Sequence, residues 1–315
     1  MDNFKKTILE LKNQLSSSDV SFLNLSKANN AGIDALIIIG MGGSGQVGDI
    51  ILNLKKDLNI KVPVVCWKDW GIPKTQFKKP LYVFISYSGN TEETISGLKG
   101  VKNKCIVTSG GEMLKIARNQ KIPCVIFNNP GIKPRQGNGL IFSSTIKLLN
   151  KYFTNIKINK ICLKNYEKKG SLLSQKLKNK IILVYSSSEN YYLAYNWKTR
   201  LNETSKSICF SGILPEICHN EIEILENKRF KKDLVIIFLT GSKEKKEINT
   251  KIKKLKTLFK IKKIQFLDIK NEGENKIEEA FNSILLADWT SYYLAKINKA
   301  NPGTNNLIDI LKSLK

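Results

Sequence analysis

Short apolar runs alternate with amphipathic stretches along the first half of the chain. Runs of this kind, bounded by glycine, proline or asparagine, predict buried strands. The predicted strands are residues 35–39, 62–66, 81–86, 105–108 and 123–127. Helical patterns lie between them, at residues 48–57, 91–98 and 112–120. Strands and helices that alternate with short connections predict right-handed crossovers and a parallel sheet.

The pattern restarts in the second half of the chain. Residues 151–180 are lysine-rich, and we predict that they are helical and carry the chain across a domain boundary. Further elements are predicted as strands at 181–185, 207–211, 234–240 and 264–269 and helices at 190–206, 277–297 and 307–314. A length of 315 residues suits two domains of about 150 residues each. The predicted fold class is therefore α/β, with domains at residues 1–152 and 153–315, each a mostly parallel sheet flanked by helices.

The charge of the chain is strongly positive, with 52 basic and 27 acidic residues and a formal net charge of +25. Only four of the basic residues are arginine, and the lysines spread along the whole sequence. Nucleic-acid-binding proteins usually gather arginine and aromatic residues in one patch, so a solvated lysine surface is favoured over a nucleic-acid interface. The positive field should still attract anionic substrates.

The sequence shows no sign of a membrane segment or of a metal site. It has no run of about 18 uncharged apolar residues, and its first fifteen residues read as a charged amphipathic helix rather than a signal peptide. The six cysteines form no CxxC pair and there is a single histidine, so neither zinc nor another metal is expected. Most of these cysteines lie in apolar runs, where a reduced cysteine behaves as a small hydrophobic residue. Because reduced cysteines are typical of the cytoplasm, we expect a cytoplasmic protein.

Two glycine- and hydroxyl-rich segments follow predicted strands. The first, GMGGSG, contains Gly43 and Ser44, and the second, SYSGNTEET, contains Ser86, Ser88 and Thr91. Ligands of open parallel sheets bind where strands end and helices begin, and glycines let backbone amides approach an anion there. Two such loops on one sheet would converge on one small anion, which predicts a phosphate site.

The same residues also fit three alternatives to a phosphate site. The first loop satisfies the GxGxxG dinucleotide fingerprint, with Asp69 as an acidic residue downstream, so a nicotinamide enzyme is not excluded. The first loop could also be a turn that only packing requires. The hydroxyl groups of the second could simply cap a helix.

Four further segments extend this pattern to a family. After the two loops come PGIKPRQGNG, NETSK and LPEICHNEIE, and the chain ends DWTSYYLAKINKANPGTNNLIDILKSLK. This order resembles the bifunctional phosphoglucose/phosphomannose isomerases, members of the sugar isomerase (SIS) family, over essentially the full chain. The resemblance implies two SIS-type domains, of which the first carries the phosphate-binding loops. It also implies aldose–ketose isomerisation of glucose 6-phosphate and mannose 6-phosphate to fructose 6-phosphate through an enediol, without a cofactor.

The resemblance assigns roles to single residues. It implies that Glu203 is the base and that Arg135 stabilises the enediol oxygens. His219 and Lys312 would assist ring opening, with His219 donated to the neighbouring subunit of a homodimer and Lys312 on a terminal helix that completes the site. Gly43, Ser44, Ser86, Ser88 and Thr91 carry over as the phosphate cradle.

The sequence departs from the family pattern in two places. Thr304 is the nearest candidate for the threonine associated with room at C2 of the sugar, but NPGTNN replaces a DPTP-like segment, which bears on the mannose activity. Gln136 and Asn138 stand where small residues are expected. A non-catalytic phosphosugar-binding regulator is the alternative, but such a module would not need Glu203, His219 and Arg135 together.

Overall fold

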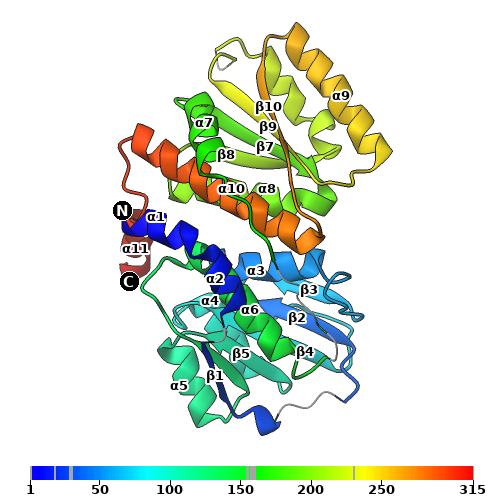
Figure 1. The fold of residues 1–315 in the computed structure, drawn as a ribbon. Helices are drawn as coiled ribbons and strands as arrows, with labels where there is room; N and C mark the ends of the chain where they lie inside the picture. The colour runs from blue at the N-terminus through cyan, green and yellow to red at the C-terminus, as the bar shows by residue number, and fades with distance from the viewer. Residues whose placement is uncertain are drawn as a thin grey trace. The chain divides into compact units, whose positions relative to one another are not determined.

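The computed structural model describes residues 2–17, 19–27, 31–153, 156, 161–229 and 231–314. The chain divides into two compact units, each with its own sheet (Figure 1). We call Leu9–Ile161 the N-terminal unit. The C-terminal unit comprises Met1–Ile8 and Cys162–Lys315.

The described part of the N-terminal unit contains one six-stranded sheet, sheet A, in the order β1-β6-β5-β4-β2-β3. Its strands are β1 (Val20–Leu23), β2 (Ala35–Ile39), β3 (Val64–Trp67), β4 (Pro80–Ser86), β5 (Lys104–Thr108) and β6 (Cys124–Phe127). Neighbouring strands are parallel except for β1, which pairs antiparallel with β6. Every residue of β2 and β4 is buried, as expected for strands covered on both faces.

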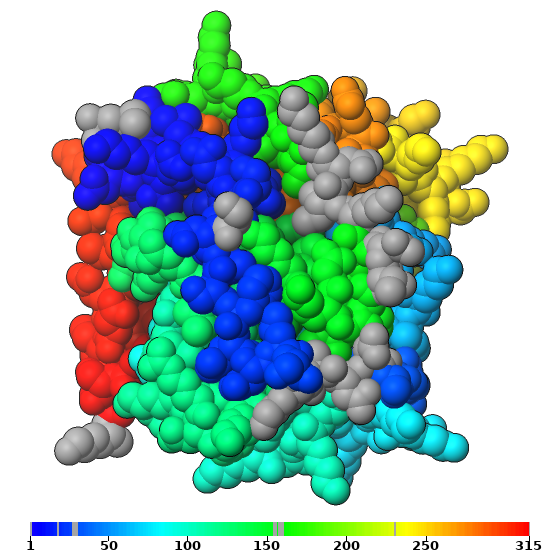
Figure 2. Space-filling model, turned by 60° about the horizontal axis from the view of Figure 1, so that its bottom comes forward, coloured from blue at the N-terminus to red at the C-terminus, as the bar shows by residue number. Residues whose placement is uncertain are grey.

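Helices cover sheet A and connect its strands. They are α2 (Leu11–Ser16), α3 (Gly42–Asn53), α4 (Glu92–Ser96), α5 (Gly111–Asn119) and α6 (Asn138–Leu149), with the 3₁₀ turns η1 (Leu25–Lys27), η2 (Gly97–Gly100) and η3 (Pro134–Gly137). Helix α6 is buried along almost its whole length. Helix α2 packs against it, and the Ser143 hydroxyl donates to the carbonyl of Gln14 over 2.9 Å. Figure 2 shows the blue surface of α2 beside the green surface of α6.

The C-terminal unit contains sheet B, a four-stranded parallel sheet in the order β10-β9-β7-β8. The strands are β7 (Ile181–Ser187), β8 (Cys209–Leu214), β9 (Leu234–Thr240) and β10 (Gln265–Lys270). The helices are α1 (Asn3–Leu9), α7 (Glu167–Leu177), α8 (Tyr191–Glu203), α9 (Lys246–Ile261), α10 (Lys276–Ile297) and α11 (Asn306–Ser313), with the 3₁₀ turns η4 (Ser188–Asn190), η5 (Glu216–His219) and η6 (Glu221–Glu226).

Two helical layers enclose sheet B. Leu183 and Tyr185 of β7 face a cluster that includes Phe259 of α9, whereas α7, α8 and α10 pack together on the other side. The alternation of side chains along β7 separates these two faces. On the α10 side, the buried Arg200 donates from Nε to Oδ1 of Asp288 over 2.7 Å.

The first residues of the chain belong with the C-terminal unit through contacts to α10 and α7. The hydroxyl of Tyr292 donates to a carboxylate oxygen of Asp2 over 2.5 Å, and the rings of Phe4 and Tyr292 stack with centroids 5.9 Å apart. Lys5 forms an ion pair with Glu167. An amphipathic segment at one end of the sequence is therefore buried against helices from the other end.

The structure confirms the predicted α/β class and the strands of both halves, with shifts at their ends. Strand β1 was not anticipated, because it is a short edge strand whose residues are partly exposed and carry no alternating pattern. The predicted helix at 48–57 instead begins at Gly42, at the end of the glycine loop. Within the described residues, no helix has the length and apolar character that crossing a bilayer requires.

The helical prediction for residues 151–180 is wrong for much of its described part, which is helical only in α7. Residues 154–155 and 157–160 lie outside the described residues. The backbone amide of Cys162 donates to a Glu278 carboxylate oxygen over 2.8 Å, and that of Lys164 donates to Oδ1 of Asn282 over 3.0 Å. Side chains of α10 thus bind these backbone amides, which replaces the bonds that a helix would supply.

Candidate active site

The two glycine- and hydroxyl-rich loops lie side by side at the carboxyl edge of sheet A. The first follows β2 and the second follows β4, and these two strands are adjacent and parallel. A Cβ on Gly40 would come within 2.8 Å of the carbonyl oxygen of Ile85, so the first loop packs against the backbone at the end of β4, where the second loop begins. The structure therefore confirms that the two loops converge at one edge of the sheet.

Hydroxyl groups tie the two loops into one cradle. The buried Ser44 hydroxyl accepts from the backbone amide of Tyr87 over 3.0 Å, which joins the first loop to the second. The Ser86 and Thr91 hydroxyls are 2.9 Å apart, and the Ser86 hydroxyl also accepts from the Gly89 amide over 3.1 Å. Thr91 stands at the N-cap of α4, but its hydroxyl makes no capping hydrogen bond. Helix capping by Thr91 therefore does not account for the second loop.

Ser88 is more peripheral than the other hydroxyl residues of the cradle. Its side chain is exposed, and its hydroxyl accepts from the backbone amide of Asn90 over 3.2 Å. Tyr87, beside it, points inward and donates to Oδ1 of Asn129 over 2.8 Å. Burial raises the pKa of Tyr87 to about 12, so the phenol stays a neutral donor at physiological pH.

Arg135 lies directly against the first loop. A Cβ on Gly43 would be 2.7 Å from the carbonyl carbon of Pro134 and 2.8 Å from the amide nitrogen of Arg135, so only glycine fits. Asn138 fixes the same contact, because its Nδ2 donates to the carbonyl oxygen of Gly43 over 2.8 Å. Arg135 is 2% exposed, so a side chain that carries a permanent positive charge is buried at the residue whose backbone packs against the glycine loop.

Gln136 and Asn138, the two residues that depart from the family pattern, both lie at the contact between the Arg135 segment and the first loop. Asn138 is fully buried at the start of α6 and holds the glycine loop. The Gln136 backbone carbonyl accepts from Nε2 of Gln14 over 3.0 Å, while the Gln136 side-chain Nε2 is buried without a hydrogen-bond partner in the described structure. A buried amide donor without a partner costs free energy unless a ligand or water binds it.

Chemically, the N-terminal unit offers the parts of an anion site. Backbone amides of the glycine loop open the twelve-residue helix α3, whose N-terminus carries a partial positive charge. The hydroxyl groups of Ser86 and Thr91 add donors, and Arg135 adds a full charge. Such a site suits the phosphate group of a small molecule.

Glu203 lies at the end of α8 in a second cluster, which belongs to the C-terminal unit. Nδ2 of Asn305 donates to Oε2 of Glu203 over 3.3 Å. The Lys206 ammonium donates to the carbonyl oxygens of both Glu203 and Thr304, each over 2.6 Å. The structure thus brings together the predicted base and the residue predicted to affect substrate selectivity. Glu203 and Thr304 are both partly buried.

His219 lies on the other side of sheet B from Glu203. It ends η5, whose Ile217 packs into the cluster that includes Phe259 of α9. Helix α8, which ends at Glu203, packs on the opposite face, where Trp197 donates to Ser283 of α10 over 3.1 Å. His219 also follows the carboxyl end of β8, whereas Glu203 precedes its amino end. One C-terminal unit therefore does not bring these two residues together.

Lys312 lies in the last turn of α11, and its side chain is exposed. None of the residues of this helix is buried, including Leu307, which is 82% exposed. The C-terminal unit by itself therefore gives Lys312 no packed position.

Sequence reasoning overlooked Asn305 and Lys206 as neighbours of Glu203. Both stand in segments that had been singled out, NPGTNN and NETSK, but no local pattern says that residues 102 positions apart meet. Two asparagines after Thr304 were the available signal, since a buried or partly buried amide usually has a hydrogen-bond partner.

Comparison with known proteins agrees with these observations. Residues 166–314 match the family described as bacterial phospho-glucose isomerase C-terminal SIS domain. The matched residues lie within the C-terminal unit. The C-terminal domain of glucosamine-fructose-6-phosphate aminotransferase from Francisella tularensis has a similar fold, with a TM-score of 0.69 at 12% identity, covering 96% of this chain and 98% of that one.

Two relatives extend the similarity across both units. A bifunctional phosphoglucose/phosphomannose isomerase of Aquifex aeolicus is 29% identical over 88% of this chain and 89% of its own length. One from Thermoplasma volcanium is 28% identical over 98% of each chain. The resemblance drawn from the motifs is thereby confirmed over nearly the whole sequence.

Proposed function

We propose that the protein is a phosphosugar isomerase that converts glucose 6-phosphate, and mannose 6-phosphate, to fructose 6-phosphate. The observation that carries this proposal is the packing of Arg135 against Gly43, beside two loops of amide and hydroxyl donors. This arrangement combines an anion anchor with a charge that can stabilise an oxyanion next to it. The names of the full-length relatives support the same reaction.

In this mechanism the sugar phosphate binds in the cradle formed by Gly43, Ser44, Ser86, Ser88 and Thr91. Glu203 removes the proton from C2 of the open-chain aldose and returns it to C1, which passes through an enediol. Arg135 stabilises the charge that develops on the O1 and O2 oxygens. The buried Nε2 of Gln136 is a further donor, which we assign to a sugar hydroxyl because the described structure gives it no other partner.

Asn305 and Lys206 hold the base in this scheme. The amide of Asn305 binds one carboxylate oxygen of Glu203 and so restricts the orientation of the carboxylate toward the substrate. Lys206 joins the carbonyls of Glu203 and Thr304, so movement of the Thr304 segment would also move the base. This link supports a role for Thr304 in the space around C2, where glucose 6-phosphate and mannose 6-phosphate differ.

His219 would act in the site of a second chain, so the working enzyme would be a homodimer. The supporting observation is that sheet B separates His219 from Glu203 within one C-terminal unit. A neighbouring chain can supply an imidazole that the same chain cannot. His219 and Lys312 would then open the sugar ring by proton transfer at O5. We assign the enzyme to the cytoplasm, where its substrates would occur.

The test is direct observation of turnover. Glucose and mannose 6-phosphates labelled with ¹³C are incubated separately with the protein in D₂O with EDTA, and products are followed by NMR. Fructose 6-phosphate that carries some deuterium at C1 is expected from both, because the proton held by Glu203 exchanges with solvent before part of it is returned to C1. Complete transfer of the C2 hydrogen to C1 would favour a direct hydride shift over the enediol. Tight phosphosugar binding without any product would favour the non-catalytic regulator instead.

A further inference from the structure

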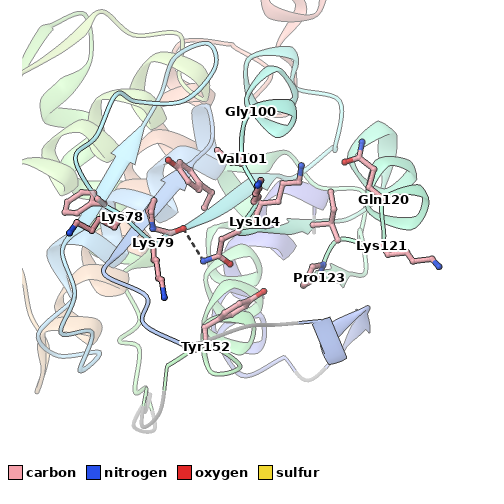
Figure 3. Close-up of a pocket in the computed structure, with 16 residues that line it drawn as sticks. Lys78, Lys79, Gly100, Val101, Lys104, Gln120, Lys121, Pro123 and Tyr152 are labelled. Atoms are coloured by element: carbon pink, nitrogen blue, oxygen red, sulfur yellow. Dashed lines mark hydrogen bonds between the residues drawn. The ribbon is translucent and has the colours of Figure 1, made fainter.

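A hollow of about 920 Å³ lies in the N-terminal unit at the amino ends of β4, β5 and β6 (Figure 3). The segments before these strands form its walls, at residues 77–80, 100–104 and 120–123. Because the three strands are parallel, this edge of sheet A is opposite the edge that carries the glycine loops. The hollow is therefore separate from the proposed phosphosugar site, and its volume is in the range of small-molecule sites.

The charge on the walls of this hollow is positive only. Five of its sixteen lining residues are lysine, and none is aspartate or glutamate. The lysines are Lys78, Lys79, Lys102, Lys104 and Lys121. Among the described residues, none of these ammonium groups has an ion-pair partner. Like charges around one concave surface repel each other, and an anion that bridges them removes the repulsion.

Lys104 shows most clearly that a countercharge is missing. It stands at the start of β5 and donates from its ammonium to the carbonyl oxygen of Leu98 over 2.5 Å, which leaves further N–H donors unused. Partial burial of this ammonium lowers the pKa of Lys104. An anion in the hollow would reverse that effect, since an opposite charge favours the protonated form.

Hydrogen bonds fix the lysine-bearing loops in place. The two carboxylate oxygens of Asp34 accept from the backbone amides of Lys78 and Lys79 over 2.7 and 3.0 Å. Nδ2 of Asn103 donates to the carbonyl oxygen of Pro80 over 3.2 Å, the dashed line in Figure 3. The Asp34 carboxylate is therefore engaged with the loop backbone. The loops hold their lysines in a fixed arrangement, which reduces the entropy lost when a ligand binds.

We propose that this hollow binds a small molecule with two or more phosphate groups. Lys79, Lys104 and Lys121 come from three separate segments of the chain, as Figure 3 shows. A chain of phosphates can therefore contact more of these lysines than a single phosphate can. The buried Tyr82 and Tyr152 add aromatic surface beside the charges, which would suit the base of a nucleotide.

Calorimetry with inorganic tripolyphosphate tests this site in the full chain, at a fixed ionic strength of about 0.15 M. We expect the exposed-loop variant Lys78→Gln/Lys79→Gln and the single variant Lys104→Gln each to bind about tenfold or more weakly. The matched control is Lys253→Gln/Lys260→Gln on α9, which removes the same charge as the double variant from exposed positions and should bind as the unchanged protein does. Thermal melting verifies that each variant is folded.

Titration with ATP distinguishes a nucleotide from an inorganic polyphosphate as the ligand of the hollow. Tighter binding of ATP than of tripolyphosphate identifies a nucleotide, and weaker binding identifies an inorganic polyphosphate. The proposal is overturned if tripolyphosphate does not bind, or if the α9 control loses as much affinity as the loop variant. Displacement of tripolyphosphate by glucose 6-phosphate would also overturn it, because the anion would then occupy the glycine loops.

Discussion

A heterodimer built from two inactive variants tests where His219 acts. One chain carries Glu203→Gln and the other carries His219→Ala. The two are co-expressed with different affinity tags so that the mixed dimer can be purified. If each site takes its base from one chain and its histidine from the other, the mixed dimer contains one intact site and one site that lacks both groups.

The geometry of sheet B gives the reason to expect this outcome. Strand β8 has six residues and separates Glu203 from His219 along the sheet, about 20 Å at roughly 3.3 Å per residue. The two residues are also on opposite faces of the sheet. Proton transfer requires heavy atoms within about 3 Å, so both residues of one C-terminal unit cannot serve the same sugar.

The expected activity follows from counting sites. The mixed dimer should have about half of the wild-type kcat per dimer, because one of two equivalent sites is complete. Dimers of either single variant should be slower than wild type by about 10²- to 10⁴-fold, the usual contribution of one acid–base group. A mixed dimer of Glu203→Gln with a Glu203→Gln/His219→Ala chain is the control, and it should stay inactive.

Isomerisation of glucose 6-phosphate, followed by NMR, is the assay. A mixed dimer no more active than the single variants would refute the sharing of His219 between chains. Inactivity of the wild-type protein would count against the isomerase itself and would leave the question of sharing aside. A monomeric wild-type protein with full activity would contradict both the dimer and the geometric reasoning.

Four further predictions concern single positions. Glu203→Gln should slow turnover by about 10²- to 10⁴-fold and leave phosphosugar binding by calorimetry almost unchanged, and an equal loss of both would count against its role as the base. Gly43→Ala should destabilise the fold by about 1–3 kcal/mol in urea unfolding and weaken phosphosugar binding, because the added Cβ would overlap the backbone at Arg135. The control Gly100→Ala, whose added Cβ would lie 3.7 Å from the nearest atom, should have neither effect. Gln136→Leu should raise KM for glucose 6-phosphate severalfold without unfolding the protein, and an unchanged KM would rule out the contact with a sugar hydroxyl. Hydrogen bonds from Lys164 and Lys169 lower the pKa of Glu272 from 4.5 to about 2, so its contribution to stability is present above pH 4.5 and is lost as the pH falls toward 2. Because its side chain is 35% exposed, Glu272→Gln should lower the free energy of unfolding by only about 0.5–1 kcal/mol at pH 7 and by less at pH 3. An equal cost at both pH values would contradict this.

Much of the fold could be predicted because the decisive signals are local. The continuous apolar runs of β2, β4 and β9 fit only buried strands, and each matches the structure closely. Of the two failures, one has a tertiary cause and the other a local one. Residues 161–166 lack a helix because α10 supplies partners for their amides, and β1 is an edge strand with no apolar pattern.

By itself, the sequence determined the α/β class, the two glycine- and hydroxyl-rich loops and the motifs around Arg135, Glu203 and His219. Each of these depends on residues a few positions apart, whose spacing sets strand, turn or helix. Only the tertiary structure decided which distant residues meet: Arg135 with Gly43, and Asn305 with Glu203. It also decided that sheet B separates Glu203 from His219, and that lysines from three segments of the chain line one hollow. The physical reason is that packing brings together residues far apart in the chain, and no local pattern encodes which of them will touch.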